Sequence, residues 1–345
     1  MLHTRFIRPR LLCIAVTACV LTSVGCSAGN ESGADSKPTD KTSRPAAGKK
    51  PTGPEGSFSI LTYNVAGLPA EISKENPAEH IPLISPLLDQ YDVVLTQEDF
   101  DWWGDLAGKF DFVNYHERLR ANATHPFETA QHPGPEAVDL DMSQRPMPLI
   151  GDGQGIMSRF SFTDEQRHPW TSCFGGIDTS DGGAGDCLAM KGFAVVTLTL
   201  SPGLEIDVYT LHMEAGGTDA DQQLQADNVA QLSRFIAQHS VGRAIVVGGD
   251  TNLHTESDHP DANGDADTQL WASLLADSDL TDACAATDCA ETSRIDKIAY
   301  RSSQAVELQA TSYDVPTASF RDPSGIDLSD HEPVVVNMKW NAITS

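Results

Sequence analysis

The sequence predicts an α/β fold in which two sheets pack together and helices lie on the outside. Apolar segments of strand length outnumber amphipathic segments of helix length. Some neighbouring strands are separated only by a turn such as Ser201-Pro-Gly203, whereas others are separated by a helical segment. Strands that outnumber helices, joined by both hairpins and helical crossovers, are typical of an α/β sandwich.

Strand segments are identified by their β-branched and apolar residues and by the turn or polar residues that end them. In chain order they cover residues 58–64, 92–97, 155–159, 193–200, 205–211, 243–249, 294–300 and 333–338. Residues 118–150 carry few periodic signals and several prolines, so we expect a long surface loop there.

Helical segments are identified by apolar residues at helical spacing. They cover residues 76–90, 100–110, 220–239 and 270–276. Pro82 and Pro86 should make the first helix short or irregular. Asp267 or Thr268 is the expected cap of the last helix, because short polar side chains bind the free N–H groups of a helix start.

The first 25 residues resemble an export signal. Arg5, Arg8 and Arg10 form a basic start, and an apolar run from Leu11 to Val24 follows. That run is too short to span a bilayer comfortably, so a cleaved signal is favoured over a membrane helix.

Ser23-Val-Gly-Cys26 closes the signal and resembles a bacterial lipobox, in which Cys26 becomes the lipidated first residue. Cleavage by an ordinary signal peptidase is the alternative. A lipid on Cys26 would anchor the protein to a membrane surface. Residues 26–56 are rich in Ser, Gly, Pro and Lys and predict a flexible tether, followed by one domain over residues 57–340. We therefore expect an exported protein, either a cell-surface lipoprotein or a secreted one.

Cysteines of the predicted domain indicate disulfides. Cys173, Cys187, Cys284 and Cys289 are an even number in an exported body. By proximity in sequence we expect the pairs Cys173–Cys187, which would close a Gly-rich loop over residues 171–190, and Cys284–Cys289. A zinc site is the weaker alternative, because neither pair has the spacing of a zinc knuckle.

The chain is strongly acidic. Its formal net charge is −26, and loss of the three arginines of the signal would take it to −29. Such a surface repels long polyphosphates, which counts against tight nonspecific binding to nucleic acid. It does not exclude a nuclease, because bound divalent cations can locally invert the potential.

Polar side chains that a buried strand does not need lie in or next to six of the predicted strands. They are Asn64, Glu98, His212, Asp250 with Asn252, Asp296, and Asp330 with His331. A single such residue could be accidental, but six at the same kind of position predict one site. The set is rich in oxygen and contains no cysteine, which suits a hard cation: Mg²⁺ first, with Mn²⁺ or Ca²⁺ as alternatives.

In its strand-end motifs the sequence resembles the endonuclease/exonuclease/phosphatase superfamily, which includes deoxyribonuclease-I-like proteins. The resemblance covers about residues 58–339. Its pieces, in the order of the family, are Thr62-Tyr-Asn-Val65, Thr96-Gln-Glu98, Thr210-Leu-His212, Gly249-Asp-Thr-Asn252, Arg294-Ile-Asp296 and Ser329-Asp-His331. The resemblance implies a four-layer α/β sandwich with two mainly antiparallel sheets, and metal-dependent cleavage of phosphoesters.

The resemblance also implies a role for each residue. Glu98 is the principal metal ligand, Asn64 assists it, and Asp330 supports the metal centre. Asp250 binds or orients the attacking water, and Asn252 holds the scissile phosphate.

His212 stabilises the transition-state oxyanion or the leaving group. His331 is the general base, oriented by Asp296, or contacts the phosphate if Asp250 is the base. An imidazole held by a carboxylate is a competent base near neutral pH.

Structural alternatives exist for several of these residues. Asn64 could simply end its strand, and His212 could be a buried core histidine. Asp330 and His331 could form a turn. Asp99 lies next to Glu98, so which of the two faces the site stays open.

The substrate is less defined than the chemistry, because one fold serves many phosphoesters. Predicted export, the acidic charge and the segment Asp186-Cys-Leu-Ala-Met-Lys-Gly-Phe193, which resembles bacterial neutral sphingomyelinases, favour a phospholipid or a small phosphodiester. The alternatives are a secreted nuclease and a surface-binding lipoprotein without activity. We expect a monomer.

Overall fold

The two sheets predicted from the sequence are present in the computed structural model. It describes residues 53–68, 73, 75–100, 114–132, 141, 143–145, 148, 150–176, 185–254, 265–290 and 294–343. The chain divides into two units, Met1–Lys49 and Lys50–Ser345, and the second contains all of the described residues.

The first sheet has six strands in the order β11-β12-β1-β2-β4-β3. β1 runs parallel to β2, and all other neighbours are antiparallel. The strands are β1 (Glu55–Asn64), β2 (Val93–Gln97), β3 (Phe127–Glu128), β4 (Gly155–Ser158), β11 (Val306–Asp314) and β12 (Val334–Ala342).

The second sheet also has six strands, in the order β5-β6-β7-β8-β10-β9. β7 runs parallel to β8, and the other pairs are antiparallel. The strands are β5 (Phe162–Pro169), β6 (Gly192–Ser201), β7 (Leu204–His212), β8 (Ala244–Asp250), β9 (Thr281–Asp282) and β10 (Asp296–Arg301). Both sheets are therefore mainly antiparallel, as predicted.

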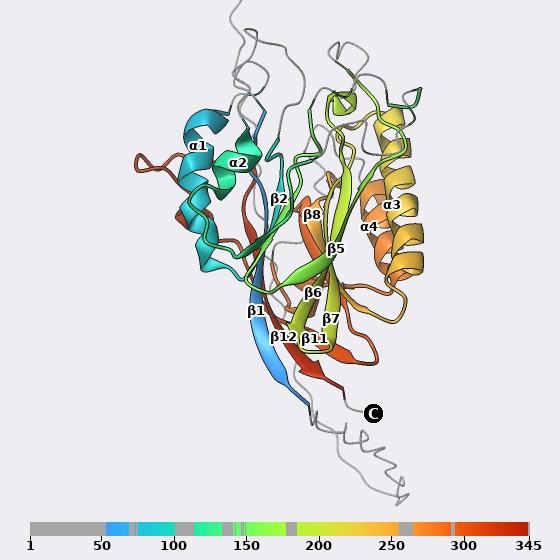
Figure 1. Cartoon of the computed structure of the whole chain (residues 1–345). Coiled ribbons are helices and arrows are strands. Elements are labelled where there is room, and N and C mark those ends of the chain that lie inside the picture. The colour runs from blue at the N-terminus through green and yellow to red at the C-terminus, as the bar shows by residue number, and fades with distance from the viewer. Residues whose placement is uncertain are drawn as a thin grey trace, which may run out of the picture. The chain divides into compact units, whose positions relative to one another are not determined.

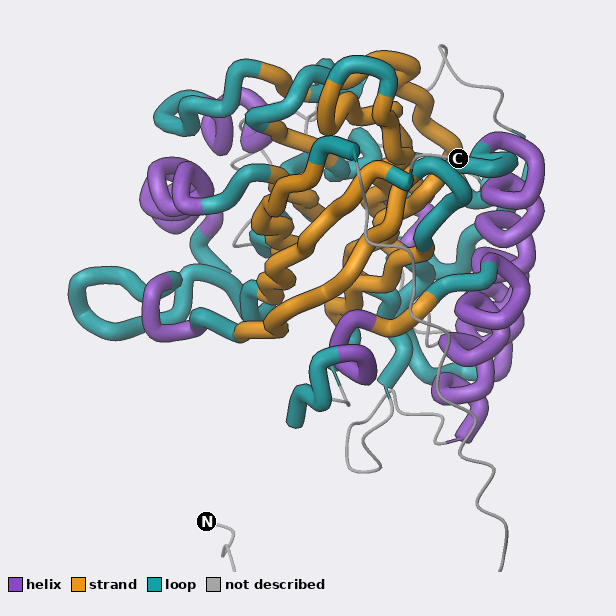
Figure 2. Tube along the Cα trace, turned by 90° about the horizontal axis from the view of Figure 1, so that it is seen from below, coloured by secondary structure: helices purple, strands orange, loops and turns teal. Residues whose placement is uncertain are grey.

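Helices cover the outer face of each sheet, which gives four layers (Figure 1). On the first sheet lie α1 (Pro77–Ile84), the 3-10 helix Ser85–Gln90 and α2 (Tyr115–Arg120). On the second sheet lie α3 (Asp219–His239) and α4 (Asp265–Ser278). Figure 2 shows the strands between these two groups of helices. The remaining helical turns are Asp186–Leu188, α5 (Ala283–Ala286) and Thr317–Ser319.

Alternation along the central strands builds the core between these layers. In β1, Ile60 packs between the two sheets, whereas Leu61 packs under α1. In β8, Val246 faces the other sheet and Val247 faces α3. Successive side chains of a strand point to opposite faces, so a strand covered on both faces is apolar throughout.

The two sheets approach closely just below the strand ends that carry the predicted site. A Cβ atom at Gly248 would lie 2.8 Å from Leu95 Cδ1 in the facing sheet, so only glycine fits there without a shift. Beside it the Gln97 amide donates a hydrogen bond of 3.0 Å to the Thr210 hydroxyl across the sheets. This contact fixes the spacing of the sheets where the site residues emerge.

Several element predictions need correction. Residues 118–150 are not simply a loop, because α2 and β3 fall within or overlap this range. β5 and β11 were not predicted. α4 begins at Asp265, so neither Asp267 nor Thr268 caps it. The predicted short first helix is confirmed, since α1 contains Pro82 and passes into a 3-10 helix. Of the predicted helix 100–110, only Phe100 belongs to the described residues, so this prediction lies outside them.

Both predicted disulfides are present. Cys173 pairs with Cys187, and Cys284 pairs with Cys289. The bridge Cys173–Cys187 connects the two sides of the Gly-rich loop. It holds the segment that leads into β6 against the segment around Cys173.

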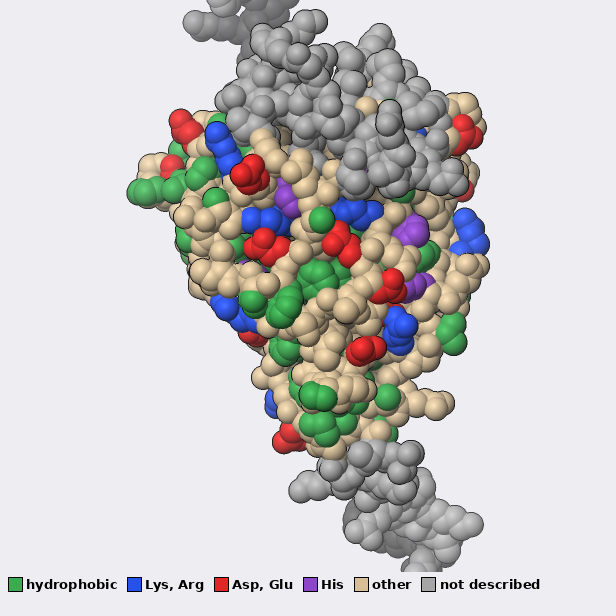
Figure 3. Space-filling model, viewed as in Figure 1, with side chains coloured by type: hydrophobic (Ala, Val, Ile, Leu, Met, Phe, Trp, Pro, Cys, Tyr) green, Lys and Arg blue, Asp and Glu red, His purple; other side chains and the backbone are tan. Residues whose placement is uncertain are grey.

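One face of the described surface carries mixed charge. On the face drawn in Figure 3, acidic and basic side chains are interspersed, and lysine and arginine form no continuous track over its described part. Among the helices of the described residues, none is both long and apolar enough to cross a membrane.

Candidate active site

Strand direction brings the predicted residues to one end of the sandwich. β1 and β2 run parallel, so Asn64, the last residue of β1, lies beside the start of the segment that holds Glu98. β7 and β8 are also parallel, and their last residues, His212 and Asp250, are paired. β10 runs in the opposite direction and begins at Asp296, which pairs with Asp250. The carboxyl ends of neighbouring parallel strands are where ligand and catalytic groups meet in many α/β proteins.

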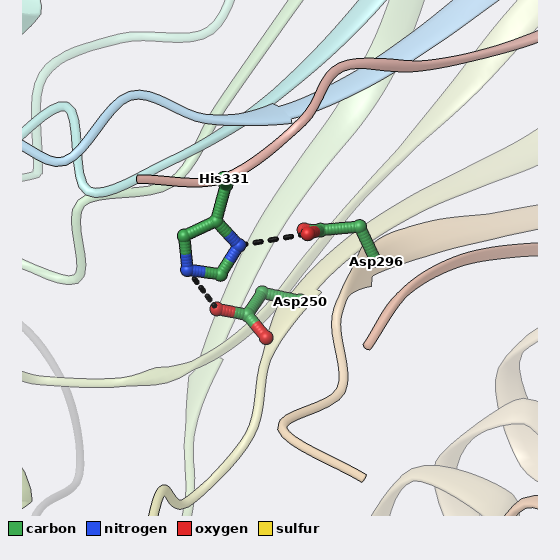
Figure 4. A group of neighbouring side chains, drawn as sticks. All are labelled: Asp250, Asp296 and His331. Carbon is green, nitrogen blue, oxygen red and sulfur yellow. Dashed lines mark hydrogen bonds and ion pairs between the residues drawn. The ribbon is translucent and has the colours of Figure 1, made fainter. Parts of the chain in front are cut away.

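His331 and Asp296 form a hydrogen-bonded pair across the two sheets. His331 Nδ1 lies 2.7 Å from Asp296 Oδ2, and His331 Nε2 lies 3.7 Å from Asp250 Oδ2 (Figure 4). Burial disfavours the charged imidazole, but attraction from Asp296 and Asp250 outweighs it and raises the pKa of His331 well above its ordinary value. The carboxylate of Asp296 thus contacts the ring at Nδ1, and Nε2 faces Asp250.

Asn64 connects the residues of the two sheets. Its buried amide nitrogen lies 3.0 Å from Glu98 Oε1, 3.0 Å from Asp250 Oδ2 and 3.3 Å from His331 Nε2. Its amide oxygen accepts a hydrogen bond from the backbone N–H of Ala66. A residue that merely ended a strand would not make these contacts, so the structure places Asn64 in the site.

Glu98, rather than Asp99, faces the site. Its backbone has a φ of 60°, a left-handed conformation that is uncommon for a side chain of this kind. Burial raises the pKa of Glu98, and the hydrogen bond from Asn64 and the charge of Lys191 partly oppose this. Asp99 is instead buried beneath the site, where it pairs with Arg120 at 2.7 Å.

Asp250 is the ionised carboxylate at the centre. Burial alone would raise its pKa, but the charges of His331 and Lys191 and the hydrogen bond from Asn64 outweigh burial and lower it to about 2. Asn252 follows in a left-handed conformation, with φ of 50°, and its backbone N–H donates to Asp250 Oδ1 at 3.0 Å. The amide nitrogen of Asn252 is bound to the Met213 carbonyl at 3.0 Å, which fixes the side chain next to β7.

His212 is buried against Asp250. Its Nε2 lies 3.4 Å from Asp250 Oδ2, and its Nδ1 has no hydrogen-bond partner within the described part of the chain. Burial and the charge of Lys191 lower the pKa of His212 well below its ordinary value. The ring is therefore neutral near pH 7 and can donate one hydrogen bond.

Asp330 lies at the rim rather than in the centre. Its side chain is exposed, and its carboxylate lies 3.5 Å from the Ser329 hydroxyl. Its charge helps to raise the pKa of both Glu98 and His331, so it lies within electrostatic reach of them. Its role as a metal ligand stays a prediction.

Three further groups behind the site were not assigned a role from the sequence. Lys191 is buried and paired with Asp186, and its charge acts on Glu98, Asp250 and His212. Glu214 follows β7 and is fully buried; burial and the nearby charge of Asp186 raise its pKa to about 9. The only signal for Lys191 and Asp186 in the sequence is that both lie in the segment that resembles neutral sphingomyelinases.

The donor atoms fit a divalent cation. Glu98 Oε1 and Asp250 Oδ2 both lie 3.0 Å from the Asn64 amide nitrogen, so two carboxylates of the kind that bind Mg²⁺ lie close together, whereas Asn64 presents a hydrogen-bond donor to them. Donor atoms of Asp250, Asp296 and His331 also lie within 4.8 Å of one another. Because His331 already binds one oxygen of Asp296, the carboxylates of Glu98 and Asp250 are better placed to bind a metal ion. Of the predicted ligands, Glu98 and Asn64 lie together there, and Asp330 lies apart at the rim.

The fold is a two-sheet α/β sandwich, and its site gathers carboxylates, an amide and two imidazoles at one end of the sheets. An imidazole held by a carboxylate stands beside oxygen donors at the meeting point of two sheets, which is an arrangement for activating water next to a phosphate. The chain belongs to the Endonuclease/Exonuclease/phosphatase family, whose pattern matches residues 61–331.

Relatives of known name support this membership. The chain is 32% identical over 296 residues to a sphingomyelinase of Mycobacterium tuberculosis, and the match covers 83% of this chain and 54% of the relative. A sphingomyelinase of Mycobacterium bovis matches to the same extent. The chain thus spans about half the length of the curated relatives it matches.

Solved structures share the fold at low sequence identity. Beta toxin from Staphylococcus aureus matches with a TM-score of 0.55 and 17% identity, over 81% of this chain and 99% of the toxin chain. A humanized D. rerio TDP2 matches with a TM-score of 0.56 and 18% identity, over 82% of this chain and 98% of its own.

Proposed function

We propose that this protein is an exported, divalent-metal-dependent phosphodiesterase that cleaves the head group of a phospholipid, as a sphingomyelinase does. The observation that carries the chemistry is the contact of Asn64 with Glu98, Asp250 and His331, completed by the bond between His331 and Asp296. These contacts support a site in which an imidazole exchanges a proton with water beside carboxylates that would hold a metal ion.

Proton transfer is assigned to the Asp296–His331 pair. Asp296 holds the ring through Nδ1, so Nε2 is the atom that exchanges a proton with the attacking water. Asp250 is ionised and lies within 3.7 Å of that nitrogen, which suits it to orient the water. The alternative is that Asp250 accepts the proton and a protonated His331 contacts the phosphate.

The remaining residues act on the phosphate. His212 is neutral and donates a hydrogen bond to an oxygen on which negative charge develops in the transition state. Asn252 contacts the phosphate from the end of β8. We propose that Glu98 and Asn64 bind Mg²⁺, with Asp330 contributing from the rim. The bound cation would offset charge on the phosphate and lower the pKa of water.

Similarity supports a lipid substrate. The relatives that match most of this chain carry the name sphingomyelinase, at 32% identity. Beta toxin, which shares the fold, has been solved with bound magnesium ions. On the described part of the face drawn in Figure 3, acidic and basic side chains are interspersed, and no basic track for a long polyanion is seen there.

Location is part of the proposal. We propose that residues 1–25 direct export, that Cys26 is lipidated, and that residues 26–56 tether a monomeric catalytic domain, residues 57–340, to the membrane surface. A tether of this kind would keep the site close to a lipid substrate and raise its effective concentration.

Two substrates test the proposal with the full-length chain. Phosphocholine release from sphingomyelin vesicles and nicking of supercoiled plasmid are measured with Mg²⁺ and with excess chelator. We expect Mg²⁺-dependent release of phosphocholine without nicking. His331→Ala should abolish it, whereas Glu128→Gln, a change on the exposed strand β3, should not. No release from vesicles, with plasmid intact as well, would reject the proposed function.

A nuclease is the second candidate, because the chain shares its fold with TDP2, which has been solved in complex with a single-stranded DNA product. Mg²⁺-dependent nicking without phosphocholine release would support it. Loss of both activities, with binding to vesicles retained, would support the non-catalytic lipoprotein.

A further inference from the structure

We infer that the ion pair between Arg294 and Glu332 is a positioning device that holds His331 against Asp296. Arg294 lies two residues before Asp296, and Glu332 directly follows His331. The guanidinium Nη1 of Arg294 contacts Glu332 Oε2, so the pair joins the same two segments that the Asp296–His331 bond joins. The inference rests on the proposed function, in which those two residues transfer the proton.

Asp296 depends on its backbone for its position. His331 binds its Oδ2, but its Oδ1 is buried and has no hydrogen-bond partner within the described ranges. A carboxylate held by one side-chain contact can rotate or withdraw unless the segment that carries it is fixed. Catalytic groups lose efficiency when their supporting contacts leave them about 1 Å out of place.

Each residue of the segment Arg294-Ile-Asp296, which leads into β10, is held by contacts of its own. Arg294 binds Glu332 through its side chain, and its backbone carbonyl accepts a hydrogen bond from Lys297 Nζ. The carbonyl of Ile295 accepts hydrogen bonds from the backbone N–H of Thr251 at 3.0 Å and from its hydroxyl at 2.6 Å. The approach to β10 is thus anchored to the end of β8 by Ile295 and to the His331 segment by Arg294.

The His331 segment is held on both sides as well. On one side the Ser329 hydroxyl accepts from the His331 backbone N–H at 3.1 Å and donates to the Asn64 carbonyl at 2.7 Å. On the other side Glu332 binds Arg294 and accepts from the Thr317 hydroxyl at 2.8 Å. Removing Glu332 would leave the segment with the Ser329 contacts and the Asp296–His331 bond alone.

The partial exposure of the two side chains indicates that the ion pair acts on the geometry of the site rather than on the stability of the fold. The side chains of Arg294 and Glu332 are 17% and 46% exposed, and exposed ion pairs contribute little to the free energy of unfolding. The hydrogen bond from Arg294 lowers the pKa of Glu332, so the carboxylate is charged throughout the neutral range. The pair should therefore matter for the geometry of the site more than for stability.

A double-mutant cycle tests the inference in the full-length protein. The variants are Arg294→Ala, Glu332→Ala, the double variant and Arg294→Lys, assayed for phosphocholine release from sphingomyelin vesicles. If the two residues act as a unit, each single variant should lower kcat about 10-fold or more with KM nearly unchanged, and the double variant should lose no more than a single one. Arg294→Lys should recover part of kcat.

A matched control is the exposed pair Arg321–Asp327, which lies within one loop before Ser329 and does not join the two sheets. Asp327→Asn should leave kcat unchanged. A second readout is independent of turnover: the NMR signal of the His331 Nδ1 proton, assigned by its loss in His331→Gln. This signal should broaden or shift in Arg294→Ala and in Glu332→Ala, but not in Asp327→Asn.

The outcomes are distinct. Full kcat and an unchanged His331 signal in both single variants would overturn the inference. So would additive losses in the double variant, or an equal loss in Asp327→Asn. An inactive wild-type protein would reject the proposed function, and the NMR signal would still decide whether the ion pair positions His331.

Discussion

Asp296→Asn separates the role of this carboxylate in catalysis from its effect on stability. The change keeps the shape of the side chain but removes the charge that attracts the His331 ring at 2.7 Å. Asparagine can also present its NH₂ group to Nδ1, which would favour the wrong tautomer of the imidazole.

The size of the effect follows from the bond that is lost. A hydrogen bond to a charged group contributes about 1.5–3 kcal/mol, which corresponds to about 10- to 150-fold in rate. If the wrong tautomer forms, the loss in kcat could approach about 10⁴-fold, as for the equivalent change in serine protease triads. Stability should change in the opposite sense, because burial and the nearby charge of Asp250 raise the pKa of Asp296 and make its charged form costly.

The assay compares kcat/KM for sphingomyelin hydrolysis and Tm at pH 7.5 in wild type, Asp296→Asn and the control Asp314→Asn at the exposed end of β11. We expect a loss of about 10-fold or more only in Asp296→Asn, with Tm unchanged or higher. A variant with wild-type kcat/KM would refute the assigned role of Asp296. A fall of Tm by about 5 °C or more would show that the loss reflects damage to the fold.

Three further predictions concern the metal, a buried acid and the N-terminus. Glu98→Gln should abolish activity and reduce the rise in Tm that Mg²⁺ gives the wild-type protein; an equal rise in both would exclude Glu98 as a ligand. The pKa of Glu214 is raised to about 9 in the folded state, so the folded protein keeps a proton on this carboxyl that the unfolded chain releases above about pH 4.5. The free energy of unfolding should therefore fall by up to about 1.4 kcal/mol per pH unit between about pH 4.5 and pH 9. Glu214→Gln should flatten the pH dependence of Tm over pH 5–9, and unchanged curves would refute this. Cys26→Ser should release the protein from the cell surface into the medium, and retention at the surface would exclude the lipid anchor.

The site residues at the strand ends could be predicted because they follow a pattern that is visible in the local sequence. An apolar strand followed by an unneeded polar residue is visible in sequence, and the direction of the strands then decides which of these residues meet. Asn64, Glu98, His212 and Asp250 were assigned in this way, whereas His331 precedes β12 and was assigned from the motif Ser329-Asp-His331. The structure brings all five together. Their chemical roles stay predictions.

Groups supplied by loops were not predictable in the same way. Lys191 reaches the site because the loop closed by Cys173–Cys187 returns over the end of β7, and no periodic signal encodes such a path. Glu214 looks like an ordinary polar loop residue, and only its complete burial reveals its raised pKa. The edge strand β11 was missed although its buried and exposed residues alternate, because its sequence is largely polar.

The division of the site between two sheets has a consequence for folding. Asn64, Glu98 and His331 come from the first sheet and its connections, whereas His212, Asp250 and Asp296 come from the second. An intermediate in which only one sheet has formed holds half of the reacting groups and none of their contacts across the sheets. Recovery of enzymatic activity during refolding therefore measures the docking of the two sheets, and it should lag behind the recovery of secondary structure.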